Sequence, residues 1–136
     1  MKKLFLLLFT PFFLVAESVA TYAFQGKHYI AEYYGCSDNI FYNKGIKTAL
    51  ADGCRKSGVT ILSAEDYEFE GGGYTCLILL SESHASIHTY PEHRSCFIDL
   101  FTCGDTANFA LFIAELEDFL EPKEVQDDLI TRGKQQ

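Results

Sequence analysis

Residues Leu80–Asp105, LSESHASIHTYPEHRSCFIDLFTCGD, form the stretch from which the rest of this chain is interpreted. Two serines flank a glutamate, two histidines stand four residues apart, and a Tyr-Pro-Glu turn precedes a strand-like segment. In that segment Phe97 and Asp99 alternate with Ile98 and Leu100, which is typical of a strand with two different faces. A strand that only fills a core does not need so many polar, reactive side chains, so we expect a functional site here.

Outward from this stretch, the hydrophobic pattern predicts strands at Gly26–Tyr34, Val59–Ala64, Tyr74–Leu80, Ala85–Tyr90, Cys96–Phe101 and Val125–Thr131. Helices are expected at Asn43–Lys56, which Gly58 ends, and at Thr106–Leu120, which Asp105 or Thr106 caps. Asp66–Gly73 is expected to be an acidic loop that ends in glycines. Strands in this order pair mostly sequentially, so the predicted fold class is α+β: a two-layer sandwich with an antiparallel sheet and two helices on one face.

Composition limits the classes of function. The chain has 136 residues, the size of one domain, and a net charge of −8. We expect no nucleic-acid partner, because phosphate binding needs clustered Lys and Arg. The 5 cysteines lack zinc-binding spacing, and no metal site is predicted. Small buried side chains are expected at Cys36, Cys54, Cys76 and Cys96.

The segment Met1–Ala23 has the pattern of a secretory signal peptide: two lysines, the apolar run LFLLLFTPFFLVA, and then small residues. The apolar run is short for a membrane span. One alternative is an uncleaved anchor. Another is a cytoplasmic protein in which the start of the chain is wrongly assigned or this segment packs as an extra helix. We therefore expect a signal peptide or anchor at residues 1–23 and one folded domain at residues 24–136, in an exported, membrane-anchored or cytoplasmic protein.

The run SESHASIHTYPEHRSCFIDLFTCGD resembles the self-cleavage and active-site segment of the small bacterial S-adenosylmethionine decarboxylases, which make a pyruvoyl group from their own backbone. The segments GKHYIAEYYGC and GVTILS extend this resemblance over Gly26–Leu120, whereas the leader is foreign to the family. The resemblance implies cleavage between Glu82 and Ser83. A β chain would then end at Glu82, and an α chain would begin with a pyruvoyl group derived from Ser83.

The resemblance also implies roles for two further reactive residues. His88 matches the histidine that drives β-elimination during processing, and Cys103 matches the acid that reprotonates the substrate after CO₂ leaves. The pyruvoyl group would form a Schiff base with the substrate amine and act as the electron sink, so no diffusible cofactor is expected. His84 follows the cleaved serine and is expected only to position it.

Three more residues fall at substrate-binding positions of the family. Phe69 and Tyr90 match the pair that sandwiches adenine, and Glu92 matches the carboxylate that binds the ribose. Thr75 stands where the family often has a serine that assists processing. Because the small bacterial enzymes are homodimers, a homodimer of processed αβ units is expected. Without the resemblance, these residues would be interpreted as core aromatics and a solvated turn.

The leading hypothesis is therefore a decarboxylase that converts S-adenosylmethionine to its decarboxylated form for spermidine synthesis. One alternative is a decarboxylase of arginine or ornithine with the same fold, which would keep Ser83, His88 and Cys103 but lose the adenosine pocket. Another alternative is an exported, non-catalytic binding protein of this fold, which the leader alone favours.

Overall fold

The computed structural model describes residues 25–103 and 106–133, so the expected leader at Met1–Ala23 lies outside the described residues. Its elements are β1 (Gln25–Tyr34), η1 (Asp38–Phe41), α1 (Asn43–Ser57), β2 (Ile61–Glu68), β3 (Tyr74–Leu80), β4 (Ser83–Tyr90), η2 (Pro91–His93), β5 (Ser95–Thr102), α2 (Phe109–Leu120) and β6 (Glu124–Gly133). Apart from the two short 3-10 helices, this is the order of strands and helices that the sequence predicts.

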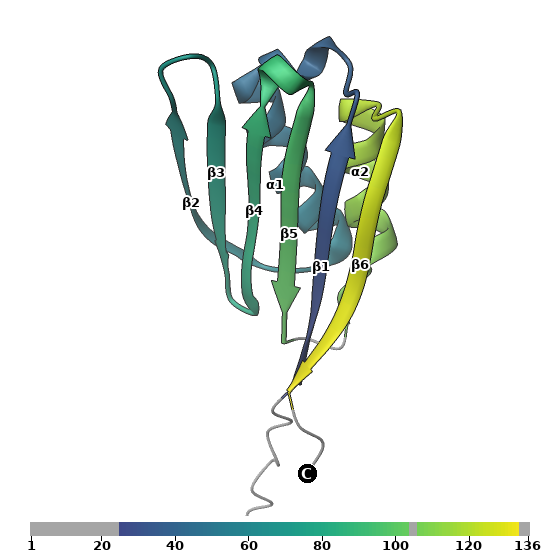
Figure 1. Cartoon of the computed structure of the whole chain (residues 1–136). Helices are drawn as coiled ribbons and strands as arrows, with labels where there is room; N and C mark the ends of the chain where they lie inside the picture. Colours follow the sequence, from purple (N-terminus) through teal and green to yellow (C-terminus); the bar gives the residue numbers. More distant parts are fainter. Residues whose placement is uncertain (1–24, 104–105, 134–136) are drawn as a thin grey trace, which may run out of the picture.

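One antiparallel sheet contains the strands in the order β2-β3-β4-β5-β1-β6 (Figure 1). Strands β2 to β5 form a meander in chain order, because short turns join each strand to the next. The first strand, β1, is inserted between β5 and β6 and pairs antiparallel with both. The N-terminal strand of the domain therefore lies among strands from its C-terminal half.

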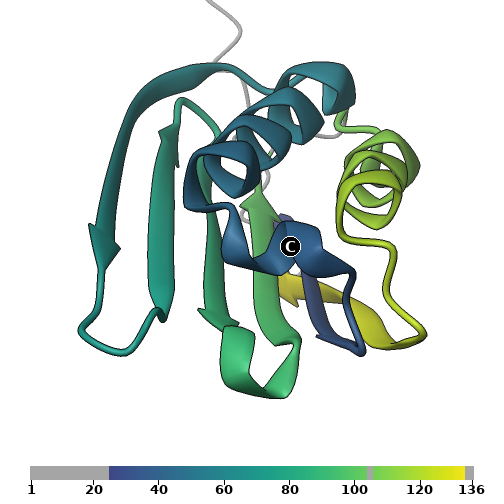
Figure 2. The same cartoon turned by 90° about the horizontal axis from the view of Figure 1, so that it is seen from above.

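Both described α-helices lie on the same face of the sheet, as the fold class predicts (Figure 2). The core forms between the two layers, because alternate residues of each strand point toward the helices. Tyr29 and Tyr33 of β1 are buried there, as are Ile98 and Leu100 of β5. On α2 the buried stripe consists of Phe109, Phe112, Leu116 and Leu120.

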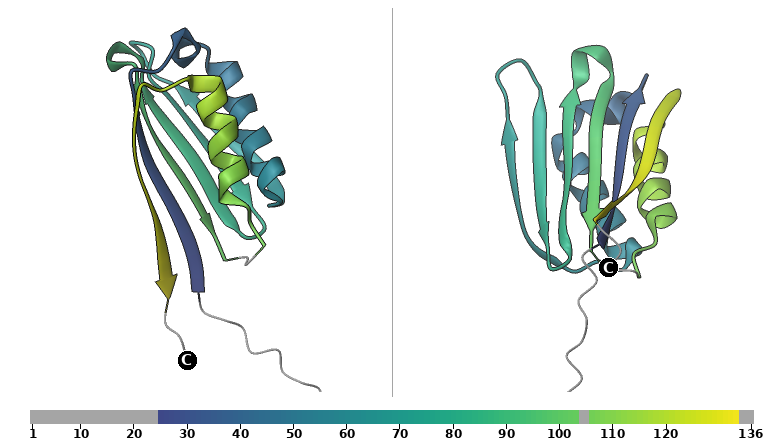
Figure 3. Two further views of the ribbon diagram at one scale, coloured as in Figure 1. Left: turned by 90° about the vertical axis from the view of Figure 1, so that its right-hand side faces the viewer. Right: turned by 60° about the horizontal axis from the view of Figure 1, so that its bottom comes forward.

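The opposite face of the sheet, here called the open face, points away from α1 and α2 (Figure 3). It carries the other alternate residues, including Phe97 and Asp99 as the sequence pattern predicts. Several large apolar side chains are exposed on this face. They include Ile30, Tyr67, Leu77, Leu79, Tyr90, Phe97 and Ile130. This apolar surface is interspersed with histidines, serines and carboxylates.

Two sequence predictions need correction. Strand β2 continues to Glu68, so most of the acidic segment forms an edge strand that pairs with β3, and only residues 69–73 form the turn. Helix α2 begins at Phe109 instead of Thr106, because the Asn108 side chain accepts a hydrogen bond from the backbone N–H of Leu111. Asp105, the other expected cap, lies outside the described residues.

The remaining local predictions agree with the structure. Gly58 ends α1 in a left-handed conformation, with φ 87°. The four cysteines expected to be small core side chains are buried, whereas Cys103 is exposed. None of the helices in residues 25–103 and 106–133 is long and apolar enough to span a membrane.

Candidate active site

Ser83, the residue expected at the cleavage site, begins β4 directly after the turn that follows β3. Its φ is 154°, a region of backbone conformation that residues other than glycine rarely adopt. Such a conformation costs about 1–3 kcal/mol and persists only where the surroundings impose it. Here the neighbouring strands impose it, because Ser83 is paired with Leu80 of β3 on one side and with Thr102 of β5 on the other. The strained residue is thus fixed between neighbouring strands.

The carbonyl group of Glu82 belongs to the peptide bond that joins Glu82 to Ser83. Its oxygen accepts a hydrogen bond from the backbone N–H of Cys103, with an N···O distance of 3.0 Å. Cys103 reaches this position because β5 ends at Thr102, the ladder partner of Ser83. A donor at this oxygen polarises the carbonyl group and stabilises negative charge that develops on it.

The Glu82 side chain turns away from the peptide bond. Its carboxylate accepts a hydrogen bond of 3.0 Å from the backbone N–H of Thr60. This backbone hydrogen bond lowers the pKa of the Glu82 carboxyl group, with a smaller contribution from the Ser81 hydroxyl. Glu82 therefore anchors the turn to the segment before β2.

The Ser83 hydroxyl contacts the next residue instead. Its oxygen lies 3.0 Å from Nδ1 of His84, within hydrogen-bond distance. The sequence analysis expects His84 only to position the serine, and the structure adds a direct contact between its ring and the Ser83 hydroxyl. We call Glu82, Ser83, His84 and Cys103 the cleavage cluster.

The other end of β4 carries a second group of residues. His88 Nδ1 lies 2.5 Å from the hydroxyl of Thr75, its ladder partner on β3. The His88 ring also packs edge-on against Phe69 and Tyr90, at centroid distances of 5.7 and 4.7 Å. These four residues, here called the aromatic cluster, include the pair expected to hold adenine. Their assembly from three separate segments agrees with a shared role.

Glu92 lies close in sequence to the aromatic cluster but on a different element. It is exposed on η2, which follows Tyr90 directly, and Pro91 at the start of that turn is buried. Arg94, the residue that follows η2, adopts a left-handed conformation, so the chain reverses there into β5. The carboxylate is therefore carried at the rim of the sheet, at the same end as the aromatic cluster.

The two clusters do not meet within one chain. Ser83 and His88 are five residues apart on one strand, a separation of about 16 Å at the rise of a β-strand. The expectation that His88 acts on Ser83 therefore has no geometric basis within a single chain. Either the histidine acts elsewhere, or it acts on the serine of another molecule.

Between the clusters lies a polar network that the sequence did not single out. Asp99 accepts hydrogen bonds from Ser86, at 3.2 Å, and from the Nε2 of His28, at 3.0 Å. The other ring nitrogen of His28 lies 3.3 Å from the Arg132 guanidinium. Because a guanidinium only donates, Nδ1 of His28 accepts and its ring proton is on Nε2. The alternation of His28 with the apolar Tyr29 indicates that His28 lies on the face opposite the core. The sequence does not indicate which strand lies beside β1, so it cannot predict the contact with Asp99.

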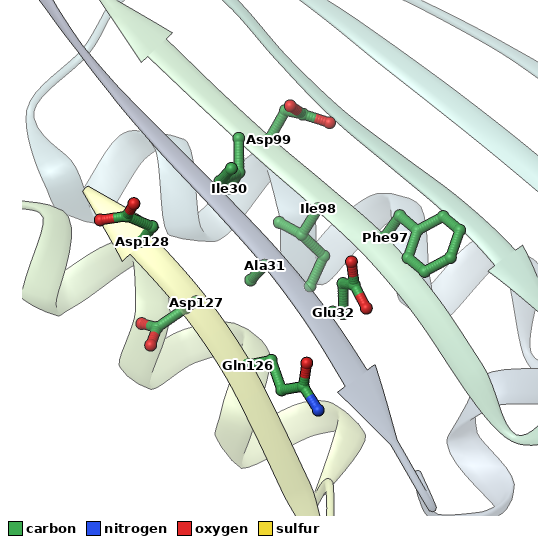
Figure 4. A pocket seen from close by; sticks show the side chains of 9 residues that line it. All are labelled: Ile30, Ala31, Glu32, Phe97, Ile98, Asp99, Gln126, Asp127 and Asp128. Carbon is green, nitrogen blue, oxygen red and sulfur yellow. The ribbon is translucent and has the colours of Figure 1, made fainter. Parts of the chain in front are cut away.

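A shallow depression of about 300 Å³ adjoins this network on the open face (Figure 4). Its lining comes from β1, β5 and β6. It includes Ile30, Phe97 and four carboxylates, those of Glu32, Asp99, Asp127 and Asp128. One side is open to solvent because nothing within the described part of the chain covers this face. The polar network, His88 and Tyr90 thus lie on the same face of the sheet as this depression.

Comparisons with known proteins agree with this geometry. The family model described as S-adenosylmethionine decarboxylase matches residues 27–133. The chain is 38% identical over 109 residues to the S-adenosylmethionine decarboxylase proenzyme of Methanococcus maripaludis (strain C5), covering 79% of this chain and 89% of that protein. It is 37% identical over 109 residues to the proenzyme of Hydrogenobaculum sp. (strain Y04AAS1), covering 79% and 81%.

A solved structure gives the same answer at the level of the fold. The crystal structure of the adenosylmethionine decarboxylase from Aquifex aeolicus VF5 superimposes with a TM-score of 0.76 and 31% identity, covering 84% of this chain and 95% of that chain. The family-model match over residues 27–133 contains both clusters. With the sheet, its two covering helices and the match over residues 27–133 in agreement, the chain belongs to the S-adenosylmethionine decarboxylase family.

Proposed function

We propose that this protein cleaves itself between Glu82 and Ser83 and then decarboxylates S-adenosylmethionine with the pyruvoyl group that forms at residue 83. Family membership supports the reaction and the substrate, since the relatives compared above are S-adenosylmethionine decarboxylase proenzymes. The observation that carries the proposal is the strained φ of 154° at Ser83, beside a carbonyl that accepts the Cys103 N–H. The product is the aminopropyl donor of spermidine synthesis.

The strained backbone has a direct chemical meaning. Attack of the Ser83 hydroxyl on the Glu82 carbonyl carbon closes a five-membered ring through N, Cα and Cβ. At the usual φ of an antiparallel strand, about −140°, Cβ points away from that carbonyl. At φ 154°, the chirality of Cα places Cβ on the same side of the N–Cα bond as the Glu82 carbonyl carbon, close to it. The conformation therefore favours ring closure, and Cys103 N–H is in position to stabilise the oxyanion.

The residues present fit a pyruvoyl group at position 83. Its precursor serine is there, the preceding carbonyl is polarised, and the exposed Cys103 adjoins the same peptide bond. The chemistry that such a group supplies is the withdrawal of electrons from the α-carbon of an amino-acid substrate. We assign to the Cys103 thiol the return of a proton to that carbon, and to Phe69, Tyr90 and Glu92 the binding of the adenosine.

We further propose a homodimer in which the open faces of two copies stack across a two-fold axis. The exposed apolar side chains of this face, such as Leu77, Phe97 and Ile30, favour burial. A two-fold axis over the middle of β4 would bring the cleavage cluster of one copy to the aromatic cluster of its partner. This arrangement would remove the separation of about 16 Å between Ser83 and His88. Each active site would then need both copies.

The experiment is intact-mass analysis of the purified protein. The wild-type chain is expected as two fragments, split between Glu82 and Ser83, with the C-terminal fragment lacking a free N-terminal α-amine. The variant Ser83→Ala is expected to remain one chain. Release of ¹⁴CO₂ from carboxyl-labelled S-adenosylmethionine, with arginine and ornithine as controls, tests the substrate. An uncut wild-type chain would leave no electron sink and would contradict the proposal.

For the N-terminal segment Met1–Ala23 we propose the role of a signal peptide or membrane anchor. Its support is the sequence pattern of two lysines, an apolar run and small residues. N-terminal sequencing of protein from the native membrane and soluble fractions tests this. A first residue near position 21 or 24 indicates a removed signal, whereas an intact Met1 in the soluble fraction contradicts both roles.

A further inference from the structure

We propose that His84 is the general base of self-cleavage, which removes the proton from the Ser83 hydroxyl as that oxygen attacks the Glu82 carbonyl. This inference rests on the proposed function, because it assigns a residue to the first step of the proposed processing reaction. It goes beyond the sequence expectation, in which His84 only positions the cleaved serine.

The hydrogen bond between the two residues is the main evidence. The Ser83 oxygen lies 3.0 Å from Nδ1 of His84. With the ring proton on Nε2, Nδ1 has a lone pair and accepts the hydroxyl hydrogen, which is the arrangement that a general base requires. Histidine is the side chain best suited to accept and return a proton near neutral pH.

The neighbouring groups do not compete for this role within one chain. The Glu82 carboxylate is engaged by the Thr60 backbone N–H, at 3.0 Å. Cys103 contributes its backbone N–H to the carbonyl oxygen instead. His88 of the same chain is about 16 Å along the strand. Among the described residues, His84 is thus the titratable group in contact with the hydroxyl.

The His84 ring is held in place although it is exposed. It packs against the ring of Phe101, its ladder partner on β5, at a centroid distance of 5.8 Å. It also meets the His28 ring edge-on, at 6.4 Å. Phe101 is itself covered by the Arg132 guanidinium, 4.8 Å from the ring centroid. This platform restricts the orientation of His84, so that Nδ1 remains directed at the serine.

The proton balance of the step is as follows. The hydroxyl proton moves to Nδ1 of His84 while the Ser83 oxygen bonds to the Glu82 carbonyl carbon, and the negative charge on the carbonyl oxygen is held by the Cys103 N–H. The C–N bond then breaks, and the Ser83 nitrogen takes up the proton from His84. An ester and a free amine result, and His84 returns to its starting state. No water or other reactant is consumed in this step.

Hydroxylamine distinguishes the first step from the second, because it cleaves esters and leaves amides intact. In His88→Ala the ester is expected to accumulate, so hydroxylamine should split the chain at residue 82. The double variant His84→Asn/His88→Ala keeps a hydrogen-bond acceptor at the Nδ1 position but has no base. Its ester should form about 10²–10⁴-fold more slowly, the usual contribution of a general base. Cell-free synthesis followed by timed hydroxylamine treatment and mass analysis measures this rate.

Two controls separate the possible outcomes. The variant His93→Ala removes an exposed histidine at η2 and should process at the wild-type rate. His84→Ala serves as a second variant, and circular dichroism and thermal melting verify that each protein is folded. If either folded His84 variant forms ester within about threefold of the rate of its parent, the base assignment is wrong while the proposed function stands. If the wild-type chain forms neither ester nor fragments, the proposed function itself fails.

Discussion

At Cys103 the backbone and the side chain have separate tasks. The backbone N–H binds the Glu82 carbonyl, whereas the exposed thiol is the proposed proton donor to substrate. Cys103→Ala keeps the N–H and is therefore expected to cleave itself into two fragments. Its decarboxylation rate should fall by about 10²–10⁴-fold, the usual loss for a general acid. Intact mass and ¹⁴CO₂ release measure the two effects separately.

A different result for processing would contradict these separate roles of the Cys103 backbone and thiol. If Cys103→Ala remained uncut while folded, the thiol would be needed for processing. Cys103→Ser is the matched control, because it keeps a small polar side chain and the same backbone donor. It should also be cleaved.

Thr75 makes the second residue-scale prediction. Its hydroxyl lies 2.5 Å from Nδ1 of His88, so it sets the orientation of that ring. Thr75→Val keeps the shape but removes the hydrogen bond, a loss of about 1 kcal/mol. Elimination of the ester should slow roughly fivefold, and the hydroxylamine-sensitive species should rise. Thr75→Ser retains the hydroxyl and is expected to behave as wild type, and equal rates for both variants would exclude this role.

At the scale of elements, α2 supplies a stability test of the corrected helix start. The Asn108 side chain caps the helix by accepting the Leu111 N–H. Asn108→Ala should destabilise the fold by about 1 kcal/mol. Thr106→Ala, at the cap expected from sequence, should change stability by less than about 0.5 kcal/mol. Thermal melting in the uncut Ser83→Ala background measures both, and a larger effect at Thr106 would reverse the assignment.

The elements also show what the sequence could predict. Alternation located β4 and β5 well, because apolar residues at every second position must face one core. The same rule ended β2 too early, since Asp66 and Glu68 lie on an edge strand whose carboxylates remain at the surface. The Asp66 carboxylate is held there by Lys47 of α1, which lowers the pKa of the carboxyl group. Such a partner from a distant segment cannot be read from local pattern.

For the candidate site, too, the sequence predicts some features and leaves others to the structure. The motif predicts roles for Ser83, His88 and Cys103. The local sequence could not reveal that Ser83 adopts φ 154° or that Cys103 donates its backbone N–H to Glu82. Both depend on the pairing of β4 with β5, which is a property of the sheet. The motif predicts which residues take part, and the strand register determines which of them lie close enough to react together.

At the scale of the whole molecule, the proposed stacking of open faces predicts complementation between two inactive variants. Ser83→Ala has no reactive serine but carries an intact aromatic cluster, while His88→Ala has the reverse. Alone, the first should remain whole and the second should stop at the ester. Co-expressed with different tags, they should form mixed dimers in which the His88→Ala chain is split. Mass analysis of each tagged chain measures this.

The control for this experiment is a mixture of two chains that both carry Ser83→Ala and His88→Ala, which should remain whole. If the mixed dimers form but the His88→Ala chain is not processed, His88 does not act across the interface. If size-exclusion chromatography with light scattering finds monomers that decarboxylate substrate, the open face is not part of a shared site.

The strand order has a last consequence for the processed protein. After the proposed cleavage, the fragment ending at Glu82 would contain β1, and that strand lies between β5 and β6, which would belong to the other fragment. The two fragments would share one sheet, because three strand pairs, β3–β4, β1–β5 and β1–β6, join a strand of one fragment to a strand of the other. We expect them to co-purify without a covalent link and to separate only in denaturant. Once separated, two polypeptides must find each other again, so recovery should depend on protein concentration, unlike that of the uncut precursor.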